Sequence, residues 1–269
     1  MKKSILYIFF MFVACQLKSQ ELFVFTEPAS NMAKGSIGFR VSNSLMKDYS
    51  SDNVNVHIFP EVMLGISKKI MIHGEAFVSN RNESFVNEGG ALYAKYRFFS
   101  KDEVHSHFRM ALFSRFALNN SDIHQSAIDL NGHNSGIEFG TVATKLIHKV
   151  ALSSSIARIY AADNINQHWS VIEKNKNAVN YTFSIGKLMI PKEYVNYNQT
   201  NVNAMLEILG QTNLGSGKSF VDVASSIQFI VKSKSRLDLG YRIAISNDLD
   251  RSAPNGGFFR YEYNIFNAF

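Results

Sequence analysis

The sequence predicts an all-β protein, a closed antiparallel transmembrane β-barrel of about twelve strands in up-and-down order. Three observations support this prediction. Stretches of alternating apolar and polar residues recur along the chain, and alternate side chains of a strand point to opposite faces. Short polar turns and longer loops alternate between these stretches. An apolar run near the N-terminus is typical of an export signal.

Residues 1–20 are predicted to be a signal peptide. Lys2 and Lys3 precede an apolar run over residues 5–14, and small or polar residues follow to Gln20. The run is too short to span a bilayer as a helix. We therefore expect an exported chain that begins after Gln20.

The only cysteine, Cys15, falls inside this leader. Processing as a lipoprotein at Cys15 is an alternative, because residues 13–15 loosely resemble a lipobox. Removal of the leader would leave no thiol for disulfide or redox chemistry. Residues 21–35 are then expected to form an N-terminal periplasmic segment, and residues 36–269 the transmembrane barrel.

Twelve stretches carry the alternation. In the clearest one, Ile37, Phe39 and Val41 share one parity and Arg40 takes the other. The stretches have roughly the 9–11 residues that a tilted membrane strand needs. The predicted strands are residues 36–45, 54–65, 70–78, 91–99, 107–118, 135–146, 150–161, 179–189, 202–210, 220–231, 236–245 and 257–269.

The connections alternate in length in the same way. Outer-membrane barrels have short periplasmic turns and longer external loops, so an even strand count places both chain ends in the periplasm. A soluble β-sandwich or water-soluble barrel is the alternative, with shorter strands and the apolar face turned inward. The expected longer loops are residues 47–53, 79–88, 119–134, 162–176, 211–218 and 246–255.

The final stretch places Tyr261, Tyr263, Ile265 and Phe269 on one face. Over its whole mature length the chain resembles bacterial outer-membrane β-barrel proteins, and these residues resemble the C-terminal signal recognised for membrane insertion. The pattern departs at Asn267, where such signals usually carry an apolar or aromatic residue. The resemblance implies location in the outer membrane and contact with outer-membrane lipids, lipopolysaccharide and the barrel-assembly machinery.

The net charge is too mild to favour nucleic acid as a partner. It is +6 for the whole sequence. The leader contains Lys2, Lys3 and Lys18 and no acidic residue, so its removal lowers the charge by three, to +3. No bound cofactor is implied.

If the apolar parity faces lipid, the opposite parity faces the lumen. It carries eight basic residues, seven acidic residues and three histidines. This near balance argues against a pore that strongly selects anions or cations. The predicted lumen residues are Arg40, Lys95, Arg97, Arg109, Arg115, Arg236, Arg242, Arg260, Glu61, Glu75, Glu138, Glu207, Asp222, Asp238, Glu262, His57, His73 and His107.

Two interiors fit these charges: a narrow lumen in which they pair, or a water-filled lumen with one basic and one acidic wall. Twelve strands lie between filled eight-stranded barrels and open porins of sixteen. We expect a narrow conduit for a small solute or ion. Its predicted constriction involves Arg40, Arg97, Arg109, Glu61, Glu75 and Arg242.

Two other functions stay open. A structural or docking barrel would bind a partner through its external loops, above all residues 162–176 with Trp169.

An enzyme is the less expected alternative. His133 and Ser135 lie at i and i+2, so the imidazole could activate the hydroxyl. The pair loosely resembles the H-x-S-N-G element of outer-membrane phospholipases and lipid A deacylases, which implies acyl-ester hydrolysis. Gly136 replaces the asparagine of that element, and Glu138 has the wrong parity to orient His133. The pair shares the parity of Ile137 and is therefore expected on the lipid side.

Metal binding is the remaining hypothesis for the histidines. His105 and His107 share a strand face, and His57 and His73 share the lumenal face with Glu61. Imidazole and carboxylate can bind a divalent cation, but no tight ligand motif is present. Hydrogen bonds to lumenal acids explain these histidines equally well, so no metal site is predicted.

Overall fold

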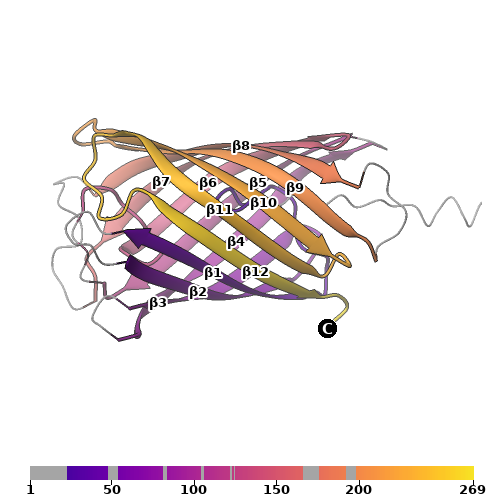
Figure 1. Cartoon of the computed structure of the whole chain (residues 1–269), viewed down its shortest axis with the longest axis horizontal. Coiled ribbons are helices and arrows are strands. Elements are labelled where there is room, and N and C mark those ends of the chain that lie inside the picture. Colours follow the sequence, from indigo (N-terminus) through magenta and orange to yellow (C-terminus); the bar gives the residue numbers. More distant parts are fainter. Residues whose placement is uncertain are drawn as a thin grey trace, which may run out of the picture.

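The structure, a computed structural model, is a single closed barrel of twelve antiparallel strands (Figure 1). It describes residues 23–47, 54–80, 84–103, 106–121, 123, 125–165, 176–191 and 198–269. The strands are β1 (Ile37–Lys47), β2 (Val54–Gly65), β3 (Ile70–Ser79), β4 (Val86–Asp102), β5 (Ser106–Asn119), β6 (Ser135–Ile147), β7 (Val150–Ala162), β8 (Asn177–Ile190), β9 (Thr200–Asn213), β10 (Ser219–Val231), β11 (Ser235–Asn247) and β12 (Gly256–Ile265).

Each strand pairs with the next in the sequence, and β1 pairs with β12 to close the barrel. In the closing pair, Ile37 stands opposite Ile265 and Arg40 opposite Glu262. The predicted fold, strand number and order are confirmed. Among the described residues, no helix has the length and apolar character needed to cross a membrane.

Two strand boundaries differ from the prediction by more than three residues. β4 has 17 residues and begins at Val86, five residues before the predicted start, because its backbone pairing continues beyond the alternating stretch. β12 ends at Ile265, so the predicted strand over 257–269 was too long. Asn267 adopts a φ of 54°, a left-handed conformation that an extended strand does not allow.

The apolar parity faces outward along the barrel. Ile137 is 47% exposed and Phe139 is 59% exposed, whereas Arg40 of the opposite parity is 7% exposed. In water this arrangement would expose many large apolar side chains, but against hydrocarbon it is the favourable one. The alternative of a soluble fold with inward apolar rows is therefore wrong.

Residues 23–36 enter the barrel, and the periplasmic location expected for residues 21–35 stays a prediction. Phe23 and Ala29 are buried, and the backbone of this stretch bonds inward-facing side chains of several strands. We call residues 23–36 the inner segment. It lies inside because buried polar groups of the wall need hydrogen-bond partners, which its backbone supplies.

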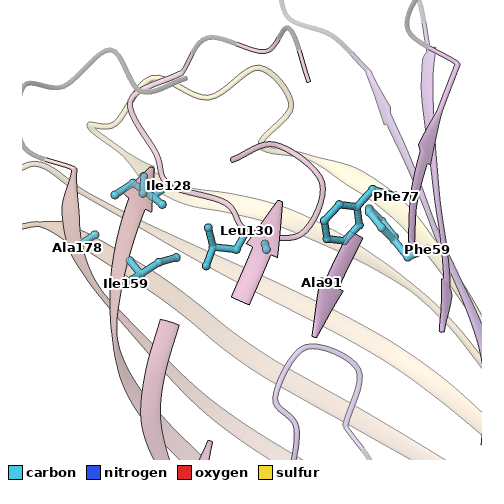
Figure 2. Close-up of a cluster of buried hydrophobic side chains, with 9 residues drawn as sticks. Phe59, Phe77, Ala91, Ile128, Leu130, Ile159 and Ala178 are labelled. Carbon is cyan, nitrogen blue, oxygen red and sulfur yellow. The ribbon is translucent and has the colours of Figure 1, made fainter. Parts of the chain in front are cut away.

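The loop between β5 and β6 folds over the end of the barrel where the longer loops lie. Ile128 and Leu130 pack with Phe59, Phe77 and Ile159 in a buried apolar cluster (Figure 2). We call residues 125–134 the lid. The end of the barrel that it covers is the long-loop end, and the opposite one is the short-turn end.

Candidate functional site

A cavity of about 340 Å³ lies between the inner segment and the lid. Its wall combines strand residues with residues of both covering segments. The side chains used below include Phe25, Glu27, Arg40, Glu61, Glu75, Tyr93, Phe113, Arg115, Asp129, Glu138, Asp222, Arg242, Arg251 and Arg260. Its size suits a small molecule.

The first anchor of the inner segment is the carboxylate of Glu207, on β9. It accepts the backbone N–H of Val24 at 2.8 Å, of Phe25 at 3.1 Å and of Thr26 at 2.9 Å. Thr26 Oγ1 also lies 2.7 Å from Ser184 Oγ. One buried carboxylate thus satisfies three consecutive donors, and such charge-assisted bonds are the stronger class.

The second anchor is a pair of arginines from β11 and β12. Arg236 donates to the carbonyl oxygen of Phe23 at 2.9 Å, and Arg260 donates to the same oxygen at 3.1 Å. Arg260 also donates to the carbonyl oxygen of Val24. Together the two anchors bind the N–H groups and the carbonyl oxygens of the same short stretch of backbone.

The third anchor is Lys95, on β4. Its Nζ donates to the carbonyl oxygens of Pro28 at 2.6 Å and Ser30 at 2.8 Å. It also lies 3.4 Å from Glu27, whose carboxylate is 3.5 Å from Arg40. Burial alone would raise the pKa of Glu27, but the charges of Lys95 and Arg40 hold that pKa well below its usual range.

Most lumenal charges pair with one another, which decides between the two interiors left open by the sequence. Arg40 lies 3.1 Å from Glu61 and 2.9 Å from Glu262. Glu61 also lies 2.5 Å from His73 Nδ1. Elsewhere, Arg236 pairs with Asp238 at 2.8 Å. The interior is therefore one in which most charges pair, and a cavity remains between the inner segment and the lid.

The predicted constriction is only partly assembled. Arg40, Glu61, Glu75 and Arg242 line the cavity. Arg97 instead donates to the carbonyl of Lys68 at 2.7 Å. Arg109 donates to Asp102 at 3.1 Å and to Ser30 Oγ at 2.8 Å. Both arginines face inward near the β4–β5 hairpin. They therefore lie at the short-turn end of the barrel.

Three charged cavity residues escaped the sequence prediction: Glu27, Asp129 and Arg251. They belong to the inner segment, the lid and the loop before β12, where no strand parity exists. Arg251 makes two bonds to Asp222, at 2.6 and 2.9 Å, and stacks on the ring of Phe220. Burial raises the pKa of Asp129, which lies in the lid.

The His133 and Ser135 pair does not form the predicted lipid-facing site. Both side chains are buried, and His133 packs edge-on against the lumenal His57 with ring centroids 5.2 Å apart. The Ser135 hydroxyl donates to the carbonyl of Asn119 and accepts its N–H. The pairing of β6 with β7 runs without a register shift through Ser135 and Ile137, and contacts with Asn119 and Asn164 cover Ser135.

The remaining predictions concern a metal site, the docking loop and the C-terminal aromatic residues. Among the residues that the structure describes, no group of three His, Cys, Asp or Glu side chains is arranged to hold a metal ion. His105 and most of the predicted docking loop, including Trp169, lie outside the described residues. Tyr261 and Tyr263 face outward on β12, and Phe269, 67% exposed, lies beyond its end.

No protein-family model matches the sequence, and no curated protein matches it. Outer membrane phospholipase A from Escherichia coli is similar in structure, with 9% identity, a TM-score of 0.43 and coverage of 96% of this chain and 98% of that chain. The β domain of the Bordetella autotransporter Brka has 10% identity, a TM-score of 0.45 and coverage of 86% and 100%. A Salmonella typhi OmpF complex with daunomycin has 9% identity, a TM-score of 0.37 and coverage of 86% and 97%.

The fold is that of an outer-membrane β-barrel. This rests on the closed antiparallel ladder, the apolar exterior and the charged interior of the chain itself.

Proposed function

We propose that this protein is an integral outer-membrane barrel that serves as a narrow conduit for a small polar solute, and that its inner segment keeps the conduit closed. The observation that carries the proposal is the way the segment is held. Wall side chains of Glu207, Arg236, Arg260 and Lys95 bind its backbone.

Removal of the segment would leave the barrel wall intact. The ladder closes between β1 and β12 from Ile37 to Met46, and none of these strand pairs involves residues 23–34. A wall lined by charged groups is also suited to hydration once the segment leaves.

The test is conductance in planar bilayers. The refolded protein should be closed for most of the record. Glu207→Gln should open more often, because an amide has one acceptor oxygen and its NH₂ group opposes the N–H donors of the segment. Deletion of residues 23–34 should give persistent steps. Glu103→Gln, at an exposed turn residue, is the matched control and should behave as the parent.

A silent barrel after the deletion would contradict the conduit. It would favour the docking alternative, which a pull-down with loop-deleted variants tests separately. Heat-dependent gel mobility of each variant verifies that the barrel has folded.

A further inference from the structure

The charges of the cavity wall nearly balance, and each arginine has an oxygen partner in the protein. Among the described residues that line the cavity, six carry carboxylates and five are arginines. Arg242 lies 3.7 Å from Asp222 and donates to the carbonyl oxygen of Ala253 at 3.3 Å. The other pairs are Arg40 with Glu61 and Glu262, Arg115 with Glu75, Arg251 with Asp222, and Arg260 with the carbonyl oxygens of Phe23 and Val24.

The carboxylates of the wall are engaged as well. Glu61, Glu75 and Asp222 belong to the pairs with arginine. Glu138, on β6, stands opposite Arg115 in the register. The remaining contacts are Lys95 at 3.4 Å from Glu27, the side-chain amide of Asn180 at 3.0 Å from Glu138, and the N–H of Asn131 at 2.8 Å and His133 Nδ1 at 3.4 Å from Asp129.

This balance favours a ligand without net charge. An ammonium or a carboxylate in the cavity would find no surplus of the opposite charge, and it would compete with an existing pair. An uncompensated charge in a buried site is costly. Neutral polar side chains line the same wall, among them Ser44 and Asn131. A hydroxyl or an amide both donates and accepts, so such groups suit a ligand that carries hydroxyls.

The wall also holds two polar atoms whose partner is missing. Within the described part of the chain, neither Nε2 of His73, on β3, nor the hydroxyl of Tyr93, on β4, has a hydrogen-bond partner. His73 is 3% exposed and Tyr93 is 6% exposed. The two residues stand opposite each other in the register, and their ring centroids are 5.0 Å apart. Buried polar groups without a partner are uncommon, so this neighbouring pair is suited to a bound ligand.

Contacts with other residues fix the two rings in place. Glu61 lies 2.5 Å from Nδ1 of His73. Phe113 stacks on Tyr93 with centroids 5.9 Å apart, and the guanidinium of Arg115 lies 5.7 Å from the centroid of the same ring. These contacts occupy the Tyr93 ring and leave its hydroxyl for a ligand. An imidazole nitrogen donates or accepts according to its tautomer, and a phenol hydroxyl does both.

We infer that the cavity binds a neutral polyhydroxy compound of about monosaccharide size. Two neighbouring hydroxyl groups of the ligand bond His73 Nε2 and the Tyr93 hydroxyl, because each of these hydroxyls can donate to one atom and accept from the other. The cavity volume of about 340 Å³ lies at the lower end of the range of ligand pockets. The inference rests on the proposed function and names the class of solute that the conduit would take.

The test is equilibrium binding to the full chain by isothermal titration calorimetry. The protein is refolded in an amine-oxide detergent, so that no sugar headgroup competes. The probes are D-glucose and D-galactose, each with its uronate and its 2-amino sugar as charged counterparts. At least one of the two neutral sugars should bind, about 10-fold more tightly than its charged counterparts, because those bring an uncompensated charge into the cavity.

Tyr93→Phe tests the hydroxyl while it keeps the packed ring. It should weaken sugar binding about 3-fold, and Tyr93→Phe combined with His73→Phe about 10-fold, as expected for the loss of one and of two neutral hydrogen bonds. Tyr96→Phe is the matched control, because Tyr96 lies on the same strand with its side chain 45% exposed on the outer face. It should leave the affinity unchanged. Heat-dependent gel mobility verifies that each variant has folded.

Failure of both neutral sugars to bind would overturn the inference and leave the two atoms as the site of a bound water only. Charged probes that bind as tightly as the sugars would also overturn it, as would an unchanged affinity in Tyr93→Phe. The outcome is separable from that of the conduit. Sugar binding by a barrel that never conducts would keep the site and refute the conduit, whereas conductance without sugar binding would refute the site alone.

Discussion

The inner segment and the lid cover the two ends of one cavity, but polar contacts have a larger share in holding the inner segment than in holding the lid. The inner segment is held by polar contacts from its backbone to Glu207, Arg236 and Lys95, and its first residues, Phe23 and Val24, also pack in a buried apolar cluster. The lid is held mainly by apolar packing of Ile128 and Leu130 against the wall. Hydrogen bonds exchange readily with water, whereas buried apolar packing resists opening. Because its polar contacts are the more numerous, we propose that the inner segment is the movable element and the lid the fixed one.

Leu130→Ala is the change expected to have the largest effect. It removes buried apolar volume from the lid cluster, and such changes cost about 2–5 kcal/mol. The measurement is urea unfolding of the refolded barrel. Leu214→Ala, at a half-exposed position of the β9–β10 hairpin, should cost far less. A similar loss in both variants would show that the lid is not packed as described.

Glu207→Gln should have a smaller and more local effect. Loss of hydrogen bonds to a charged acceptor costs about 1.5–3 kcal/mol, which corresponds to roughly 10- to 100-fold faster exchange of the amides of Val24, Phe25 and Thr26. Hydrogen exchange measures this directly. The urea midpoint should stay close to that of the parent, because the barrel ladder does not include these residues. A large fall in that midpoint would mean that the segment is part of the barrel core.

As the pH falls, the stability of the docked inner segment and that of the lid should change in opposite directions. This is the smallest of the three expected effects. The pKa of Glu27 is lower in the folded chain, so its contribution to docking is present above its ordinary value of 4.5 and is lost progressively as the pH falls below that value. The pKa of Asp129 is raised by burial from its ordinary value of 3.8. Lid stability should therefore rise as the pH falls through the raised pKa, and level off below 3.8.

Hydrogen exchange of the two segments against pH measures both slopes. Glu27→Gln should remove the acid sensitivity of the inner segment, and Asp129→Asn should remove that of the lid. The same slope for both segments would contradict the assignment of their charges.

The barrel wall was predictable from sequence because its physical rule is local. Ile137 and Glu138 are neighbours on β6 that face opposite sides, and the period of two determines this without knowledge of the rest of the fold. The rule fails where the strand conformation ends. The turn at Asn267 shortened β12, and contacts with Asn119 and Asn164 bury Ser135 although it shares the parity of Ile137.

The inner segment was not predictable in the same way. Its partners Lys95, Glu207 and Arg260 are spread over most of the chain, and no period links them to residues 23–30. Asp129 and Arg251 lie in loops, where a charged residue is ordinarily expected to be solvated. Only closure of the barrel brings these groups together around one cavity.

A disulfide trap tests the movable inner segment most directly. Ala29 and Thr144 are joined by a hydrogen bond of 2.9 Å from the N–H of Ala29 to Oγ1 of Thr144, and the only cysteine of the sequence, Cys15, lies in the predicted leader. Ala29→Cys and Thr144→Cys would be introduced together with Glu207→Gln. The oxidised protein should be silent in planar bilayers, and reduction should release conductance steps. Identical records before and after reduction would contradict closure by this segment.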